Sequence, residues 1–229
     1  MTDLHDIVLQ FDLKGQIESI RPLGNGLIND TYKVNTLDGP SYVLQRINHN
    51  IFRDVELLQN NIVSVTGHIR RKLEAEGVAD IDRKVLTFIP LKNSQVTWYF
   101  DGSSYWRVSL FIENAFTYET VNPEYSYYAG RSFGNFEAML ADIPDTLGET
   151  IPDFHNMELR ARQLEEAVAS DAVGRMAEDE VREILKEILV HREEMCKAER
   201  MYRDGTLPKR ICHCDTKVNN MMFDASGDV

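Results

Sequence analysis

The sequence predicts an α+β fold of two lobes, in which an antiparallel β-sheet lobe precedes a mainly helical one. Three observations predict it. Residues 1–113 hold short β-rich runs separated by turn clusters, and one long amphipathic segment lies among them. Residues 114–229 hold three segments with helical spacing of apolar side chains, and then a short extended segment after Pro208. We therefore predict two domains, one over 1–113 and one over 114–229.

Composition and charge restrict the class of protein. The 229 residues are 43% hydrophobic, and their formal net charge is -12. This hydrophobic content is typical of a globular protein with a packed core. The negative net charge repels nucleic acids, so we expect no nucleic-acid partner. No apolar run approaches the roughly 20 residues that cross a bilayer, and the N-terminus is acidic rather than signal-like. We expect a cytoplasmic protein with no membrane association and no obligate protein partner.

The sheet lobe is predicted from a hairpin and the helix after it. Turn-forming residues 37–40 separate two β-rich runs, 26–34 and 41–47, which predicts a hairpin. Apolar residues then recur at helical spacing from Val55 to Leu73. Three more strand-like runs complete the expected sheet: 84–91, 95–100 and 104–115.

The helical lobe is predicted from three segments with a period near 3.6 residues: 124–144, 157–171 and 179–205. The last is the clearest, because Leu185, Ile188 and Leu189 share one face while charged side chains cover the other. After it, residues 210–215 are expected to be extended and residues 219–224 to form a short strand.

Two cysteines flank a histidine near the C-terminus, at Cys212, His213 and Cys214. With Cys196 they make an odd number in a chain that does not look secreted, so we expect no disulfide. A structural zinc site needs about four ligands, and no second Cys or His pair lies at a suitable spacing. We therefore do not predict a metal site at these thiols.

A glycine pair, Gly24 and Gly26, lies among the first β-rich runs. Glycines let backbone N–H groups approach an anion closely, so the pair is a candidate phosphate-binding loop. Such a pair is more often only a turn, and Asn29 stands where the third glycine of the G-x-G-x-x-G pattern would be. Both interpretations remain open from the pattern alone.

Leu44 and Arg46 lie two residues apart in a predicted strand and so share one of its faces. If Leu44 packs on a nucleotide base, Arg46 is placed to reach the phosphates. The alternative is an arginine that extends outward into solvent.

The strongest motif is His213-x-Asp215-x-Lys217-x-x-Asn220. It has the order of a loop that serves phosphoryl transfer. That chemistry needs a carboxylate to orient a hydroxyl and accept its proton, a cation near the phosphoryl group and an oxygen ligand for Mg²⁺. Asp215, Lys217 and Asn220 supply these in turn. The alternative is a solvated polar loop without a function.

The order of parts favours the functional interpretation. A glycine loop, a strand with a cation, a helix, a candidate hinge at Phe111-Ile112-Glu113, a helical block and the His213 motif follow one another. We expect the adenine of ATP to lie against the hinge backbone.

The chain resembles the aminoglycoside phosphotransferase and choline kinase-like branch of the protein-kinase-like fold, whose loop reads H-G-D-x-x-x-x-N. More narrowly, the segments GLINDTYKV, YVLQRIN, ETIPDFHN and CHCDTKVNN are similar to those of the N-acetylhexosamine 1-kinases. The resemblance covers nearly the whole chain. It implies ATP-dependent phosphorylation of N-acetylglucosamine or N-acetylgalactosamine at the anomeric hydroxyl, with Mg²⁺.

The resemblance implies a role for each matched residue. Asp215 would be the catalytic base, Lys217 would contact the γ-phosphate, and Asn220 would bind the metal ion. Arg46 would take the place of the strand lysine. Phe154 and His155, in ETIPDFHN, would face the sugar, although a histidine after a phenylalanine is more often part of a capped turn or a core.

The chain departs from the family pattern in two places. The helix acid that should pair with the strand cation has only Glu56 as an early candidate, with Asn60 or Asn61 as replacements. The second metal ligand, an aspartate on the strand after Asn220, would lie beyond Val229. We therefore expect the chain as given to bind nucleotide weakly and to transfer little phosphate.

Three alternatives remain open from the sequence. The same chemistry would serve another small alcohol, such as choline, homoserine or an aminoglycoside, because acceptor sites vary on one scaffold. A nucleotide-binding pseudokinase would retain the loop without turnover. A purely structural module would not bind ATP at all.

Overall fold

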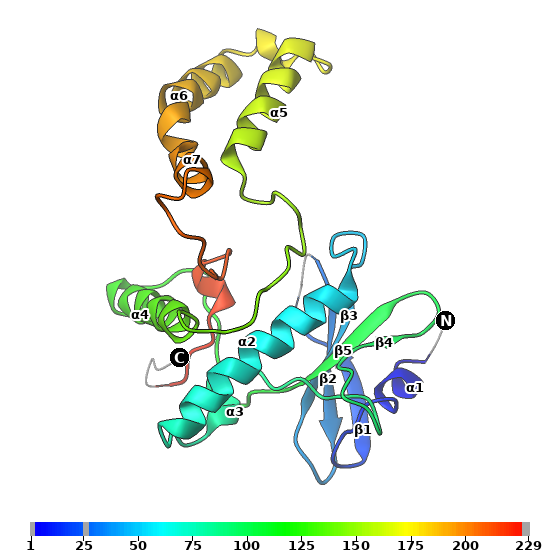
Figure 1. Cartoon of the computed structure of the whole chain (residues 1–229). Helices are drawn as coiled ribbons and strands as arrows, with labels where there is room; N and C mark the ends of the chain where they lie inside the picture. Colours follow the sequence, from blue (N-terminus) through cyan, green and yellow to red (C-terminus); the bar gives the residue numbers. More distant parts are fainter. Residues whose placement is uncertain (1–2, 25–27, 226–229) are drawn as a thin grey trace. The chain divides into compact units, whose positions relative to one another are not determined.

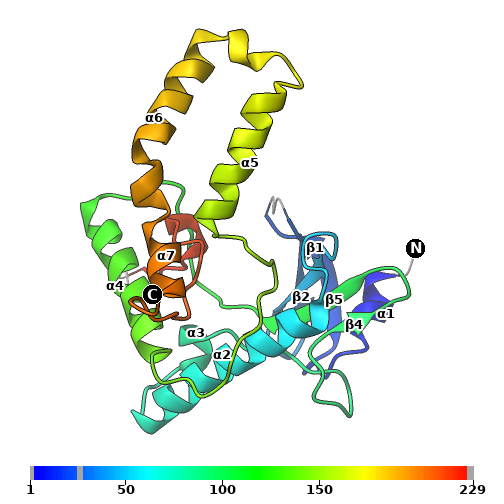
Figure 2. The same ribbon diagram turned by 45° about the horizontal axis from the view of Figure 1, so that its top comes forward.

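The computed structural model describes residues 3–24 and 28–225 (Figures 1 and 2). The chain divides into two compact units, Met1–Thr150 with Ile211–Val229, and Ile151–Arg210. Within the described ranges, no helix is long and apolar enough to cross a lipid bilayer. The predicted boundary at residue 113 separates a nucleotide-binding lobe from a lobe with the phosphotransfer loop. This division by function stays a prediction.

A five-stranded antiparallel sheet lies in the first unit, counted over the described residues (Figure 1). The strands stand in the order β1-β2-β3-β5-β4, with the bounds Ile17–Pro22 (β1), Asp30–Thr36 (β2), Tyr42–Ile47 (β3), Tyr99–Phe100 (β4) and Tyr105–Leu110 (β5). The predicted hairpin is β2 and β3, in which Tyr32 pairs with Leu44. On the other side of β3, Leu44 is opposite Val108 and Gln45 is opposite Arg107.

One face of the sheet is a packed core. Val34, Leu44 and Val108 point to this face, and each has 0% of its surface exposed. They pack with Val8 and Phe11, from the short helix α1 (Leu4–Val8) and the residues that follow it. We call this side the α1 face. The sequence pattern predicted neither α1 nor β1.

The other face of the sheet is polar in its middle. Thr31, Gln45 and Arg107 stand side by side in register on β2, β3 and β5, and Lys33 lies two residues along β2 on the same face. We call this side the polar face. The α1 face is thus filled by its core, whereas the polar face carries hydrogen-bonding side chains.

The helices of this unit are α2 (Val55–Ala75), α3 (Ile81–Lys84) and α4 (Pro123–Met139). The α2 helix follows the hairpin as predicted (Figure 1), and the Asp54 carboxylate caps it by accepting a hydrogen bond from Leu57 N at 2.8 Å. Ile69 of α2 packs against Val85 and Leu140, which joins α2 to the end of α4. This second core holds the helices together.

Two predicted strands are wrong in whole or in part. Residues 84–91 form no regular strand, and within them Phe88 makes only an isolated bridge to β5. Pro90 has no N–H to donate to a ladder, which disfavours a continuous strand here. Of the predicted strand 95–100, only Tyr99–Phe100 pairs with β5.

The second unit is helical. It holds α5 (Met157–Ser170), the short 3₁₀ helix η1 (Arg175–Ala177), α6 (Asp179–Met195) and α7 (Lys197–Arg203). The helix predicted over 179–205 is divided at Cys196, which ends α6 and precedes α7. The α5 helix agrees closely with its prediction.

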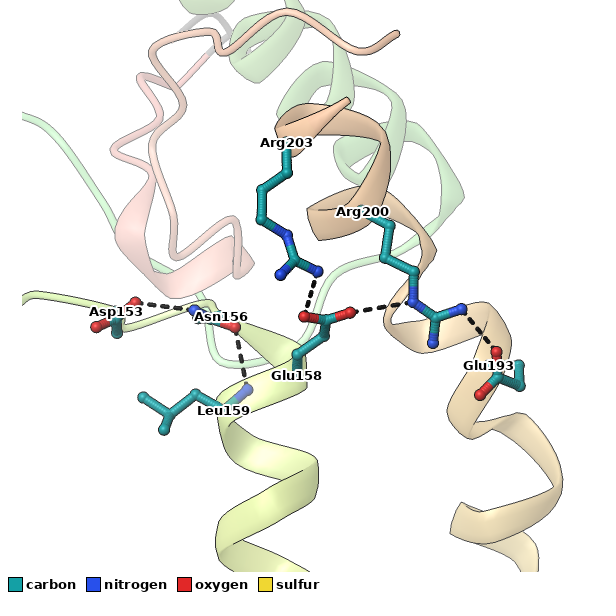
Figure 3. A network of polar contacts seen from close by, with 7 residues as sticks. All are labelled: Asp153, Asn156, Glu158, Leu159, Glu193, Arg200 and Arg203. Atoms are coloured by element: carbon teal, nitrogen blue, oxygen red, sulfur yellow. Dashed lines mark hydrogen bonds and ion pairs between the residues drawn. The ribbon is translucent and has the colours of Figure 1, made fainter. Parts of the chain in front are cut away.

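Ion pairs connect the helices of the second unit (Figure 3). Glu158 of α5 accepts a hydrogen bond from Arg200 Nε at 3.0 Å and also pairs with Arg203, both on α7. Arg200 reaches Glu193 of α6 at 2.6 Å through Nη1. The Asn156 side chain caps the first turn of α5. One carboxylate therefore ties α5 to α7, and one arginine ties both to α6.

Candidate active site

The His213 motif forms a short loop that brings its polar residues together. The Asn220 Nδ2 donates a hydrogen bond to the backbone oxygen of Asp215 at 2.8 Å, and Lys217 Nζ lies 3.3 Å from Asp215 Oδ2. The 3₁₀ turn η2 (Val218–Asn220) turns the chain so that this closure is made. The strand predicted over 219–224 is therefore wrong, apart from one bridging residue at its end.

Aromatic contacts hold this loop on α4. The His213 ring lies edge-on to Phe133 and Phe136, at centroid distances of 5.2 and 5.7 Å. Past the loop, Phe223 and Phe116 exchange two backbone hydrogen bonds of 2.8 Å each, and Phe223 is fully buried. The loop is thus fixed on both sides while its polar residues stay exposed.

Cys214 has a left-handed backbone, with φ of 65°. The loop H-G-D-x-x-x-x-N, which this motif resembles, has glycine at this position. A side chain in the left-handed region costs about 1 kcal/mol or more. Cys214 meets this cost directly before Asp215, and its thiol donates to the Cys212 backbone oxygen at 3.4 Å. Strain of this kind is common where a loop must hold a functional side chain.

The charge state of Asp215 suits a hydrogen-bond acceptor. Its pKa lies below the ordinary value, chiefly because of hydrogen bonding by the Asn220 side chain. Burial opposes this shift, whereas the Lys217 ammonium adds to it. The carboxylate is therefore ionised at neutral pH and can orient a hydroxyl group and accept its proton.

The donor set suits a magnesium ion. Mg²⁺ prefers oxygen ligands and is usually held by one or two carboxylates together with substrate phosphates. The Asp215 carboxylate and the amide oxygen of Asn220 are such ligands, and the Asn220 nitrogen is already used within the loop. In the described part of the chain, no three His, Cys, Asp or Glu side chains gather as a metal site. A metal ion would therefore depend on the nucleotide's phosphates.

Arg46 and Leu44 share a face as predicted, but it is the α1 face. Leu44 is fully buried in the core there, so it does not pack on a nucleotide base. The Arg46 Nε donates to Asp30 Oδ2 at 2.6 Å, and half of the Arg46 side chain is exposed. The phosphate contact of Arg46 stays a prediction, and the residue of β3 on the polar face is Gln45.

Two cations outside the sequence motifs contact the hinge, Lys33 of β2 and Arg83 of α3. Phe111 N donates to the Ser41 backbone oxygen at 3.0 Å. The Lys33 ammonium lies 3.7 Å above the Phe111 ring and 3.2 Å from Glu113 Oε1. Arg83 donates to the Glu113 backbone oxygen at 2.5 Å. Contact between adenine and Phe111, Ile112 or Glu113 stays a prediction.

The glycine pair is only partly described. Gly24 has φ of 68°, a conformation that favours glycine, and an added Cβ would meet nothing within 4 Å. Gly26 lies outside the described residues. Phosphate binding by this pair therefore stays a prediction.

The helix residue that faces inward is Gln59, which the sequence analysis did not consider. Glu56 and Asn60 are exposed, and Asn61 exchanges hydrogen bonds with the Gly148 backbone at 2.8 and 3.1 Å. Gln59 has 1% of its surface exposed, and neither its side-chain nitrogen nor its oxygen has a partner among the described residues. A neutral amide thus takes the buried position where a helix acid was expected.

Phe154 and His155 lie in the second unit. Their rings stack at a centroid distance of 4.7 Å with an interplanar angle of 28°, and Phe154 is half exposed. Arg160 supports this turn by donating to the backbone oxygens of Asp153 and Phe154 at 3.1 and 3.3 Å. An exposed, flat aromatic pair suits a sugar ring, but contact with the acceptor stays a prediction.

Comparisons with known proteins bear on the family and the fold of the chain. The model of the phosphotransferase enzyme family, APH, matches residues 19–229. A crystal structure of the aminoglycoside phosphotransferase from Alicyclobacillus acidocaldarius subsp. acidocaldarius DSM 446 is similar with a TM-score of 0.58 and 13% sequence identity. The match covers 100% of this chain and 64% of that one, so this chain spans less than two thirds of its length. The similarity shows the predicted α+β, kinase-like fold.

Proposed function

The chain belongs to the phosphotransferase enzyme family, and from this premise we propose that it is an ATP-dependent kinase of a small molecule. Its acceptor is the anomeric hydroxyl of an N-acetylhexosamine, either N-acetylglucosamine or N-acetylgalactosamine, and its product is the sugar 1-phosphate. The observation that carries the proposal is the loop in which Asn220 closes onto Asp215 beside Lys217.

The loop residues divide the reaction among them. The Asp215 carboxylate accepts the hydrogen bond of the acceptor hydroxyl and takes its proton as the sugar oxygen bonds to the γ-phosphorus. The bond from that phosphorus to the β–γ bridging oxygen breaks, and ADP leaves. An anomeric hydroxyl is more acidic than an ordinary alcohol. A carboxylate with a lowered pKa is therefore an adequate base, provided that it is well positioned.

Charge neutralisation supplies the rest of the catalysis. The Lys217 ammonium, 3.3 Å from Asp215, contacts the transferring phosphoryl group. Asn220 would hold Mg²⁺, which would neutralise the phosphate oxygens when it is bound. The hinge backbone at Phe111 to Glu113 holds the adenine, and Gly24 and Gly26 approach the phosphates.

The acceptor is the least constrained part of the proposal. The solved relative is an aminoglycoside phosphotransferase, so an aminoglycoside, choline or homoserine is the nearest alternative acceptor. The stacked pair Phe154 and His155 favours a sugar, since aromatic rings pack well on the apolar face of a pyranose.

The test follows the product by ³¹P NMR. The protein, expressed from its complete gene, is incubated with ATP, Mg²⁺ and separate sugars, amino alcohols and an aminoglycoside. We expect a phosphate signal coupled to an anomeric proton with an N-acetylhexosamine, and a rate about 10²–10⁴-fold lower in Asp215→Asn. The matched control is Asp6→Asn, an exposed carboxylate on α1, which should keep the wild-type rate.

Each other outcome has a definite meaning. If product forms only with another acceptor, the protein is still a kinase, but the acceptor is not an N-acetylhexosamine. ATP binding without product from any acceptor would replace the enzyme by a nucleotide-binding pseudokinase. If the protein binds no ATP, both the kinase and the pseudokinase are excluded.

A further inference from the structure

Arg107 is a cation on the polar face of the sheet that the proposed mechanism does not use. It lies in the middle of β5, directly opposite Gln45 of β3. Its Nε donates to Gln45 Oε1 at 3.0 Å, and Gln45 Nε2 donates in turn to Thr31 Oγ1 at 3.2 Å. The guanidinium also lies 5.4 Å from the Phe88 ring centroid. Gln45 and Phe88 therefore contact this side chain directly, and Thr31 holds Gln45 in place.

The positive charge of Arg107 is not neutralised by the protein. Among the residues that the structure describes, no carboxylate lies within ion-pair distance of it, and its only hydrogen-bond partner is the neutral amide of Gln45. Burial lowers its pKa to about 10, so it remains charged at neutral pH. A desolvated charge without a counter-charge is costly, and folded proteins normally pair it. An anionic ligand would supply the missing partner.

The remaining donors of Arg107 suit a phosphate. A guanidinium has five N–H groups in a rigid fork, and Gln45 uses the Nε group. The two terminal nitrogens keep their N–H groups, which have no acceptor in the described part of the chain. Such a pair of nitrogens binds phosphate or carboxylate oxygens in a bidentate manner.

Arg46, on the neighbouring strand β3, has the opposite arrangement. Its guanidinium is half exposed and paired with Asp30, and it lies on the α1 face. The position on β3 that faces the same side as Lys33 is occupied by Gln45, which carries no charge. The polar face thus lacks a cation on β3 and has one on the adjacent strand β5.

We propose that Arg107 binds a phosphate group of the nucleotide, so that β5 supplies the cation that β3 does not carry on this face. The inference rests on the proposed function, because the ligand is ATP. Gln45 acts as a positioning residue, since its side-chain oxygen accepts a hydrogen bond from Arg107 Nε and leaves the two terminal nitrogens for the phosphate.

The test separates the phosphates from the rest of the nucleotide. Calorimetry measures the affinities for ATP with Mg²⁺ and for adenosine in wild type, Arg107→Gln, Arg107→Lys and the matched control Arg71→Gln, an exposed arginine of α2. For Arg107→Gln we expect a loss of about 10- to 100-fold in ATP affinity, from the strength of charged hydrogen bonds. Its adenosine affinity should not change. Arg71→Gln should stay within about twofold of wild type, because this side chain is exposed and has no part in the proposed site.

Two outcomes would overturn the inference. One is an unchanged ATP affinity in Arg107→Gln, and the other is an equal loss for ATP and adenosine, which would show a structural role. Circular dichroism checks the fold of each variant. If Arg107→Gln does not fold, Arg107→Lys decides, because lysine keeps the charge but loses the fork; at least about threefold weaker ATP binding is then required.

A second probe keeps this inference distinct from the proposed function. Inorganic tripolyphosphate is titrated into wild type and Arg107→Gln under the same conditions. If wild type binds no ATP but binds tripolyphosphate in an Arg107-dependent manner, the kinase proposal fails and the anion site stands. If tripolyphosphate does not bind, or binds both proteins equally, while ATP also fails to distinguish them, Arg107 is no phosphate ligand.

Discussion

The two compact units are stabilised by different forces. In the first unit, apolar side chains such as Phe11, Leu44 and Val108 are fully buried on the α1 face. In the second, residues 151–210, the one buried side chain is Cys196, and Leu189 and Val190 are 57% and 69% exposed. The first unit therefore depends on hydrophobic burial, whereas the second depends largely on helix formation and ion pairs.

An open apolar groove accompanies the ion pairs of the second unit. It has a volume of about 910 Å³ and lies between α5 and α6, where Leu164, Leu185 and Ile188 contribute to its lining. Apolar surface that stays in contact with water adds little to stability. The network around Glu158 in Figure 3 connects α5, α6 and α7 beside this groove-forming pair of helices. The same type of substitution should therefore change the free energy of unfolding by very different amounts in the two units.

The largest effect is expected for Leu44→Ala. The side chain is fully buried among Val34, Trp106 and Val108, so its removal leaves a cavity as well as losing apolar burial. We expect the free energy of unfolding to fall by about 2–5 kcal/mol. Urea denaturation followed by tryptophan fluorescence measures it for this unit alone, since both tryptophans, Trp98 and Trp106, lie there. A loss below about 1 kcal/mol would show that the α1 core is loosely packed.

A smaller effect is expected for Asp101→Asn, in the turn between β4 and β5. Burial raises the pKa of Asp101, but hydrogen bonds from Ser103, Ser104 and Trp106 outweigh it and lower the pKa to about 2. The variant keeps an oxygen acceptor without the charge, so we expect a loss of about 1 kcal/mol at pH 7.

The pH dependence of this loss follows from the direction of the shift. Because the folded pKa is below the ordinary value of 3.8, Asp101 stabilises the folded state above about pH 4. That contribution falls away as the pH drops toward 2. Urea midpoints of wild type and Asp101→Asn should therefore differ at pH 5–7 and converge near pH 2. A difference that is constant over this range would contradict the assignment.

The sequence predicts the loop of the His213 motif better than it predicts the sheet of the same unit. Asp215, Lys217 and Asn220 are close in sequence, and a short turn is enough to bring them together. The fold class is also predictable, because the periods of strands and helices differ strongly. The alternation within β3 correctly places Leu44 and Arg46 on one face.

Which face is free cannot be predicted from one strand alone. Leu44 is covered because α1 folds onto it, and the sequence pattern gives no sign of that short helix. Which residue of α2 is buried is equally hard to predict, because each residue along a helix is rotated by about 100° from the one before it. Gln59 is buried while its neighbour Asn60 is exposed. Only the register of the paired strands shows that Gln45 and Arg107 lie side by side on the polar face.

A modest effect is expected for Glu158→Gln in the second unit. The glutamine cannot pair with Arg200 and Arg203, so α5 loses its ionic connection to α7. Both arginines are about half exposed, and water screens the pairs, so we expect the thermal midpoint of the helical signal to fall by about 2 °C. Far-UV circular dichroism measures it.

Salt distinguishes this effect from that of Asp101. In 1 M NaCl the Debye length is about 3 Å, so the difference between Glu158→Gln and wild type should largely vanish. The loss in Asp101→Asn comes from directed hydrogen bonds of a tight turn and should persist. Equal salt sensitivity in both variants would remove the proposed contrast between the units.

The smallest effect is expected for Leu189→Ala, the same chemical change as Leu44→Ala at an exposed site. Leu189 is 57% exposed and lines the open groove of the second unit, so shortening it removes little buried surface and leaves no closed cavity. Alanine is also the better helix former, which offsets part of the lost contact. We expect the free energy of unfolding to change by less than about 0.5 kcal/mol. A loss comparable to that of Leu44→Ala would mean that this groove is covered in solution, and the contrast between the two units would then not hold.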